Sequence, residues 1–142
     1  MKLNTILSFA FALILMGCSE AVPDRIQINR DKCDYCKMSI SDLKFSTALL
    51  TQKGRTYKFD DLSCMINYKN TMENSNTAKF FVSEFNSGNA LINAESAFFV
   101  YNENLKSPMG GNFAALSTKE KADVLAMNPG SEILTWKLLN AK

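Results

Sequence analysis

Residues 45–71, with the sequence FSTALLTQKGRTYKFDDLSCMINYKNT, contain the pattern that decides the fold. The β-prone run 45–51 and the shorter run 55–59 flank a Gln-Lys-Gly turn, and this pattern predicts a β-hairpin. The second run leads directly into Asp60-Asp61, whose carboxylates can cap the start of a helix. Apolar residues then recur at helical spacing, so we expect a helix over residues 61–71.

The same order of elements recurs in the second half of the chain. Residues 78–85 predict a buried strand that completes the first unit. In the second unit we expect two strands joined by a long loop, then a helix and a final strand, over residues 97–102, 113–116, 117–127 and 133–138. Residues 117–120 (STKE) form a capping box that opens this helix. In this alignment, Phe59-Asp60 corresponds to Leu116-Ser117.

These elements predict an α+β fold of two tandem β-β-α-β units. The units cover about residues 32–90 and 91–142, and in each an antiparallel hairpin is covered by a helix. A chain of 142 residues is long enough for one ordinary domain or two very small ones. We therefore expect a single domain over residues 32–142 that contains both units.

The N-terminus has the three parts of a bacterial secretory signal. Lys2 supplies a positive charge, and residues 6–16 form an apolar segment of 11 residues, which is too short to span a bilayer. Residues 15–18 (LMGC) resemble a lipobox. We therefore expect residues 1–17 to be a signal peptide and Cys18 to carry lipid, including palmitate. The alternative is an ordinary signal peptide with a chance cysteine.

Lipidation would make residues 18–31 a tether between the membrane surface and the domain. Ser19, directly after the lipidated cysteine, favours sorting to the outer membrane, with the domain facing the periplasm. The charges are nearly balanced, with 16 Lys and Arg against 14 Asp and Glu, so nothing indicates binding to nucleic acid. No second long apolar run follows residues 6–16, so we expect the rest of the chain to be soluble.

The cysteine count indicates a site for sulfur chemistry. With Cys18 lipidated, three cysteines remain, and an odd number in an extracytoplasmic protein suggests a free thiol, an intermolecular disulfide or a metal. The chain contains no histidine. This absence excludes Ser-His and Cys-His catalytic pairs and most zinc or Cu(II) sites, which depend on imidazole.

Five sulfur donors are candidate metal ligands. A turn would bring Cys33 and Cys36 together, and Met38 would face the same side in an extended segment. Cys64 lies in the first turn of the expected helix, where the helix dipole favours thiolate. Met109 lies in a loop between a proline and two glycines, a poor setting for a core side chain. Soft donors of this kind favour Cu(I).

Several alternatives stay open at this point. Cys33 and Cys36 could form a local disulfide, and Cys64 and Met38 could be core side chains. Met109 could be filler. The three cysteines with an aspartate could instead bind zinc. A thiol-disulfide exchange protein could use Cys33 and Cys36, although no helix is expected to follow them.

The chain resembles the NosL family, the copper-binding lipoproteins that assist assembly of nitrous oxide reductase. The resemblance rests on four features in the same order: the lipobox at Cys18, residues 33–40 (CDYCKMSI), residues 58–61 (KFDD) with Cys64, and residues 107–110 (SPMG). It implies a tandem fold similar to a domain of organomercury lyases. Some family members have histidine where this chain has Asp34, so the resemblance here implies a site made of sulfur alone.

The resemblance also implies a function. The protein would be a copper chaperone rather than an enzyme, with metal roles for Cys33, Cys36, Met38, Cys64 and Met109. It would deliver Cu(I) to nitrous oxide reductase, in denitrification, or to another copper enzyme outside the cytoplasm. A copper-exporting transporter is a possible donor. A carbon–mercury lyase on the same fold is a third hypothesis, with Asp60 as a nominal acid.

Overall fold

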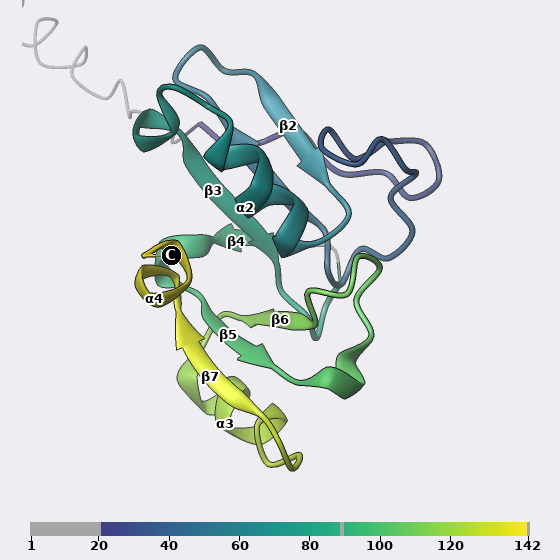
Figure 1. Cartoon of the computed structure of the whole chain (residues 1–142), viewed down its shortest axis with the longest axis vertical. Helices are drawn as coiled ribbons and strands as arrows, with labels where there is room; N and C mark the ends of the chain where they lie inside the picture. The colour runs from purple at the N-terminus through teal and green to yellow at the C-terminus, as the bar shows by residue number, and fades with distance from the viewer. Residues whose placement is uncertain (1–20, 89, 142) are drawn as a thin grey trace, which may run out of the picture.

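Two antiparallel sheets, one from each half of the chain, form the framework of the molecule (Figure 1). The computed structural model describes residues 21–88 and 90–141. Cys18 and the expected signal peptide, residues 1–17, lie outside the described residues. Among the helices that are described, none is long and apolar enough to cross a membrane.

The first sheet has four strands in the order β2-β1-β3-β4. They are β1 (Thr47–Leu50), β2 (Thr56–Phe59), β3 (Lys79–Ser83) and β4 (Leu91–Asn93). Helix α2 (Leu62–Asn70) and a short 3₁₀ turn η2 (Ser75–Thr77) connect β2 to β3. Helix α2 packs against β1 and β2, so the hairpin predicted from residues 45–59 is covered as expected.

The second sheet has three strands in the order β6-β5-β7. They are β5 (Phe98–Tyr101), β6 (Phe113–Leu116) and β7 (Glu132–Thr135). Helix α3 (Lys119–Leu125) joins β6 to β7 and packs on β5 and β6. Two 3₁₀ turns, η3 (Ala94–Ser96) and η4 (Glu103–Leu105), flank β5, and α4 (Trp136–Asn140) ends the chain.

The predicted tandem β-β-α-β fold is confirmed by the strand pairing. In each unit the first strand is central, with the second strand on one side and the third on the other. Thr47 in β1 is opposite Phe59, and Phe98 in β5 is opposite Leu116. The two pairs occupy the same place in their sheets, which confirms the alignment of Phe59 with Leu116.

The final predicted strand, residues 133–138, is wrong in its second half. Strand β7 ends at Thr135, and residues 136–140 form α4. Trp136 and Leu139 are three residues apart and both pack on the core, whereas Leu138 is exposed. This spacing fits a helix, and a short apolar run does not distinguish helix from strand by its composition.

Two smaller differences concern the ends of elements. The short strand β4 was not predicted. The cap of α3 is Thr118, whose Oγ1 accepts the N–H of Lys121 at 3.3 Å, rather than Ser117. The N–H of Ser117 instead donates to Glu84 Oε2 at 2.6 Å. The helix therefore begins one residue later than the capping box predicted.

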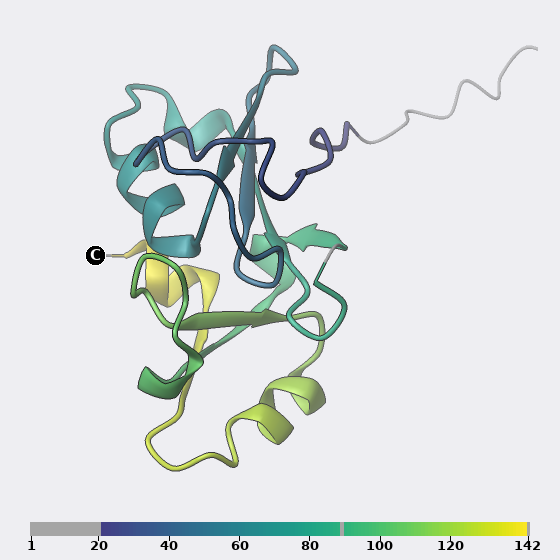
Figure 2. The same ribbon diagram turned by 90° about the vertical axis from the view of Figure 1, so that its right-hand side faces the viewer.

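Trp136 joins the two units. Its ring centroid lies 5.1 Å from that of Phe80 in the first sheet and 6.1 Å from that of Phe99 in the second. Helix α4 lies at the level where the two units meet, in both views (Figures 1 and 2). A single apolar cluster therefore runs through both units, and it also contains Cys33 and Cys64.

The segment before the first sheet lies against β2. Ile26 is buried, and Lys58 Nζ donates to the carbonyl of Arg25 and to Asp31 Oδ2, both at 2.7 Å. Neighbouring Lys58 holds the pKa of Asp31 below its usual value, although partial burial opposes this. The N–H of Asp24 also donates to Thr56 Oγ1 in β2 at 3.0 Å, so the stretch expected to be a tether contacts the domain from Asp24 onward.

We predict that Trp136→Ala lowers the free energy of unfolding by about 3–5 kcal/mol, the usual cost of truncating a large buried aromatic side chain. Leu138→Ala, an exposed leucine on the same short helix, should change it by less than about 0.5 kcal/mol. Urea unfolding of the detergent-solubilised protein, followed by circular dichroism, measures both. Equal losses for the two variants would contradict the role of Trp136 between the units.

Candidate metal centre

The loop that carries Cys33 and Cys36 closes on itself. The N–H of Cys33 donates to the carbonyl of Met38 at 2.8 Å, and the N–H of Lys37 donates to the carbonyl of Cys33 at 2.9 Å. Lys37 adopts the left-handed conformation with φ of 67°. These contacts curl the chain tightly, so that Cys33 is buried and Cys36 is half-buried.

Asp34 fixes this loop to β2. The N–H of Asp34 donates to the carbonyl of Lys58, and the N–H of Lys58 donates to Asp34 Oδ2, both at 2.8 Å. The carboxylate is thus used to hold backbone. This pair places the cysteine loop beside the end of the first hairpin, from which α2 begins.

Cys64 lies in the first turn of α2, as predicted. Asp61 is the N-cap residue, and its Oδ1 accepts the N–H of Cys64 at 3.2 Å. The cysteine is buried within the core that connects both sheets. A cap with fixed geometry therefore sets the position from which the thiol extends.

The three cysteines meet at one point. The Sγ atoms of Cys33, Cys36 and Cys64 all lie within 4.8 Å of one another, and all three thiols are free. Small rotations of the side chains could bring three sulfurs at this spacing around one ion. The local disulfide between Cys33 and Cys36 is absent from this structure.

The electrostatics of Cys64 differ from the prediction. Burial, and then the neighbouring Cys33, Cys36 and Asp61, raises the pKa of the Cys64 thiol well above its usual range. The helix dipole was expected to favour thiolate, but loss of solvent outweighs it. Burial also raises the pKa of Cys36, and the nearby N–H of Met38 offsets only part of this. An arriving cation must therefore displace protons from these thiols.

Met38 does not lie as predicted. The left-handed Lys37 means that residues 36–38 are not extended, so Cys36 and Met38 do not face one side by strand geometry. The backbone of Met38 lies close to the Cys36 thiol, and Met38 is 58% exposed.

Met109 comes close to the cysteine helix through Asp61. The N–H of Met109 donates to Asp61 Oδ2 at 3.1 Å, and the side chain is 40% exposed. A loop of the second unit is thus held against the helix start that carries Cys64. The local sequence predicts Asp61 as a cap but not this contact, because the two residues are 48 positions apart.

The geometry does not favour thiol-disulfide exchange. Cys33 is fully buried, and the first helix described after this motif begins at Leu62. Exchange proteins use a helix N-terminus to lower the pKa of the attacking thiol, and neither Cys33 nor Cys36 lies at one.

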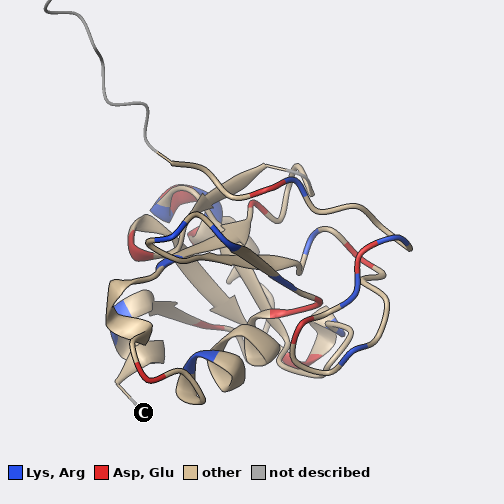
Figure 3. Ribbon diagram, turned by 90° about the horizontal axis from the view of Figure 1, so that it is seen from above, with Lys and Arg blue, Asp and Glu red and all other residues tan. Residues whose placement is uncertain are grey.

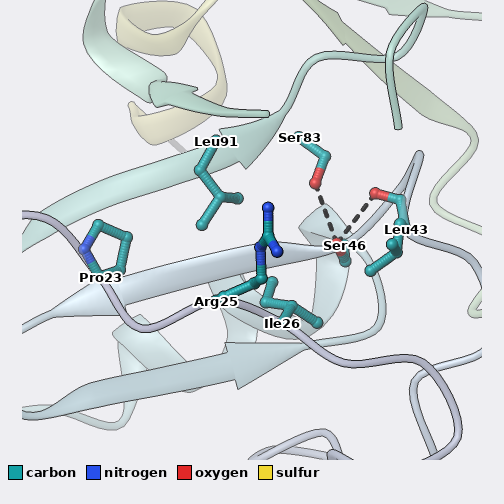
Figure 4. Close-up of a pocket in the computed structure, with 7 residues that line it drawn as sticks. All are labelled: Pro23, Arg25, Ile26, Leu43, Ser46, Ser83 and Leu91. Atoms are coloured by element: carbon teal, nitrogen blue, oxygen red, sulfur yellow. Dashed lines mark hydrogen bonds between the residues drawn. The ribbon is translucent and has the colours of Figure 1, made fainter. Parts of the chain in front are cut away.

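A separate hollow lies on the other side of the first sheet, away from the sulfur atoms. It has a volume of about 160 Å³. Figure 4 shows the Arg25 side chain standing within it, beside a hydrogen bond of 3.0 Å between Ser46 and Ser83. The other residues that line it are Pro23, Ile26, Leu43 and Leu91. It offers no soft donor, so the cysteine cluster is the candidate metal centre.

An α+β domain that presents three free thiols at one point has the donor set of a protein that binds a soft metal ion through sulfur. Comparison with known proteins identifies the family. The chain belongs to the NosL family, whose model matches residues 26–141. The resemblance found in the sequence is thereby confirmed.

One curated protein is similar to this chain in sequence, and one solved structure is similar in fold. The copper-binding lipoprotein NosL of Stutzerimonas stutzeri is 26% identical over 148 residues, covering 94% of this chain and 78% of that protein. The crystal structure of the copper chaperone NosL from Shewanella denitrificans matches with a TM-score of 0.71 and 17% identity, covering 84% of this chain and 96% of that one. Both are named for copper binding or delivery, and neither is named as an enzyme.

We predict that Cys36 reacts with iodoacetamide well before Cys33 and Cys64, because only Cys36 is partly exposed. Its rate should keep rising as the pH passes the usual thiol range, since its pKa is raised and only the thiolate reacts. Mass spectrometry of peptides from the folded protein, sampled over time, measures each site. Equal labelling of the three cysteines before unfolding would contradict the buried cluster.

Proposed function

We propose that this protein is a lipid-anchored Cu(I) chaperone that carries copper to an enzyme outside the cytoplasm. The observation that carries the proposal is the cluster of three free thiols within 4.8 Å. Cu(I) is a soft ion that takes two or three ligands, and thiolates are among its preferred donors. Zinc requires four ligands, and its sites with few cysteines usually include histidine, which this chain lacks.

The depth of the cluster suits an ion that is carried and released. Cys33 and Cys64 are buried and can protect a bound ion from oxidants and water. Cys36 is half-buried, so it gives the ion a way in and out. We assign the thiol ligands to Cys33, Cys36 and Cys64, within a copper-binding domain over residues 32–142.

The two methionines are assigned a role in exchange. Met38 and Met109 are exposed and neutral, and a thioether binds Cu(I) without losing a proton. Such donors can pass an ion between the thiols and a partner without opening the core. Five donors exceed what Cu(I) needs, so we expect thiols and thioethers to act at different stages.

The proposed location and partners rest on the family and on the N-terminal sequence. Cys18 is the proposed lipid attachment site, with residues 1–17 removed, and Ser19 favours the outer membrane. From the periplasmic face, the tethered domain would receive copper from an exporting transporter. Nitrous oxide reductase is the proposed client. Lys and Arg alternate with Asp and Glu along the described part of the ribbon (Figure 3), which suits a protein partner better than nucleic acid.

We predict that the detergent-solubilised full chain binds one Cu(I) tightly under reducing conditions. Cys36→Ser should weaken binding by more than about 100-fold, beyond the 10- to 100-fold loss that an outer-shell contact causes. Competition with a chromophoric Cu(I) chelator measures the affinity, and X-ray absorption gives the number of sulfur ligands. Met127→Ala, which removes an exposed methionine next to α3, is the matched control. Absence of copper uptake by the wild type would refute the proposal.

A further inference from the structure

The carboxylate of Asp61 connects parts of both units. Its Oδ1 accepts the N–H of Cys64 at 3.2 Å. Its Oδ2 accepts the hydroxyl of Ser107 at 2.9 Å, the N–H of Met109 at 3.1 Å and the N–H of Gly111 at 3.4 Å. Asp61 is only 2% exposed. One buried side chain therefore holds both the start of the cysteine helix and the loop that carries Met109.

The Met109 loop keeps its own shape. The N–H of Ser107 donates to Asn112 Oδ1 at 3.1 Å, and the N–H of Asn112 donates to Ser107 Oγ at 2.7 Å. The N–H of Gly110 donates to the carbonyl of Ser107 at 3.0 Å. These bonds lie within the loop and hold its shape. The contacts with Asp61 therefore determine where the loop lies against α2.

Gly111 provides a second, independent sign that this docking is close. A Cβ at Gly111 would lie 2.0 Å from Ser63 Oγ and 3.4 Å from Asp61 Oδ2. The loop backbone thus lies directly against the first turn of α2, and a side chain at this position would force Ser63 to move. Two features make the contact close: the carboxylate of Asp61 at the helix start, and the lack of a side chain at Gly111 in the loop.

We propose that Asp61 is a positioning residue, which holds the Met109 thioether at the mouth of the cysteine cluster so that it can contact the copper bound there. The inference rests on the proposed function. Both oxygens of Asp61 are occupied by donors, and a hard carboxylate is a poor ligand for Cu(I). Asp61 therefore acts through Met109 and Cys64 rather than on the ion.

The chain supplies a matched control in Asp60. This neighbouring aspartate is also 2% exposed, but its Oδ1 accepts the N–H of Ser41 at 3.0 Å, in the segment before β1. Its substitution removes a buried carboxylate of the same kind and leaves the described contacts of the Met109 loop in place. A merely structural effect of losing such a group should thus appear in Asp60→Asn as well.

The test is a double-mutant cycle on the detergent-solubilised full chain, with Cu(I) affinity measured by chelator competition. Met109→Ala should weaken binding about tenfold in the wild type and in Asp60→Asn. In Asp61→Asn, the added substitution Met109→Ala should have no further effect. The amide nitrogen that replaces Oδ2 cannot accept the N–H groups of Met109 and Gly111. X-ray absorption should show the same loss of sulfur in Asp61→Asn as in Met109→Ala, with Asp60→Asn unchanged.

A tenfold effect of Met109→Ala that persists in Asp61→Asn would overturn the inference and leave the copper-binding proposal standing. Failure of the wild type to bind copper would overturn both. If Asp61→Asn does not fold, Gly111→Val replaces it in the cycle, since a branched side chain against Ser63 lifts the loop and keeps the helix cap. The same loss of the Met109 effect is then expected, and its persistence would overturn the inference.

Discussion

The buried carboxylate of Asp61 is the constraint on which the arrangement of the site depends. A carboxylate removed from water is costly unless hydrogen bonds replace its solvent, and here three N–H groups and one hydroxyl do so. The donors would in turn be left unsatisfied without it. The first turn of α2 and the Met109 loop therefore need the same group. Through Asp61, the helix start and the loop hold each other in position, although they belong to different units of the fold.

The thiol cluster is governed by a related balance between charge and burial. Loss of solvent raises the pKa of Cys36 and Cys64, so these thiols keep their protons and the core avoids buried negative charge. A cation that enters supplies the missing charge and releases protons. If all three thiols were buried, a bound ion could not easily leave the site. Partial exposure of Cys36 instead leaves one sulfur open to a partner, which suits the transfer of an ion between proteins.

Local patterns in the sequence were sufficient to predict most of the framework. The hairpin over residues 45–59, the cap at Asp61 and the tandem order all depend on residues close together in the chain. The errors arose where distant contacts decide. Trp136 begins a helix because two sheets surround it, and the Cys64 thiol is hard to ionise because the core surrounds it. The turn that joins Cys33 and Cys36 could be foreseen from their spacing, and a shared role with Cys64 from the resemblance. The contact between Asp61 and the Met109 loop could not be foreseen.

The repeat shows how one scaffold supports two different tasks. Asp61 and Thr118 occupy equivalent positions, and each caps its helix by accepting the N–H three residues later. That N–H belongs to Cys64 in the first unit and to Lys121 in the second, where the side chain pairs with Glu84 at 3.5 Å. The short turn between β1 and β2 corresponds to the long loop between β5 and β6, which carries Met109. The first unit thus carries the three cysteines, and the longer hairpin loop of the second carries Met109 and contacts Asp61. Because the cap of the first helix is a carboxylate with a second oxygen to spare, it can also receive that loop, which a threonine cap could not do as fully.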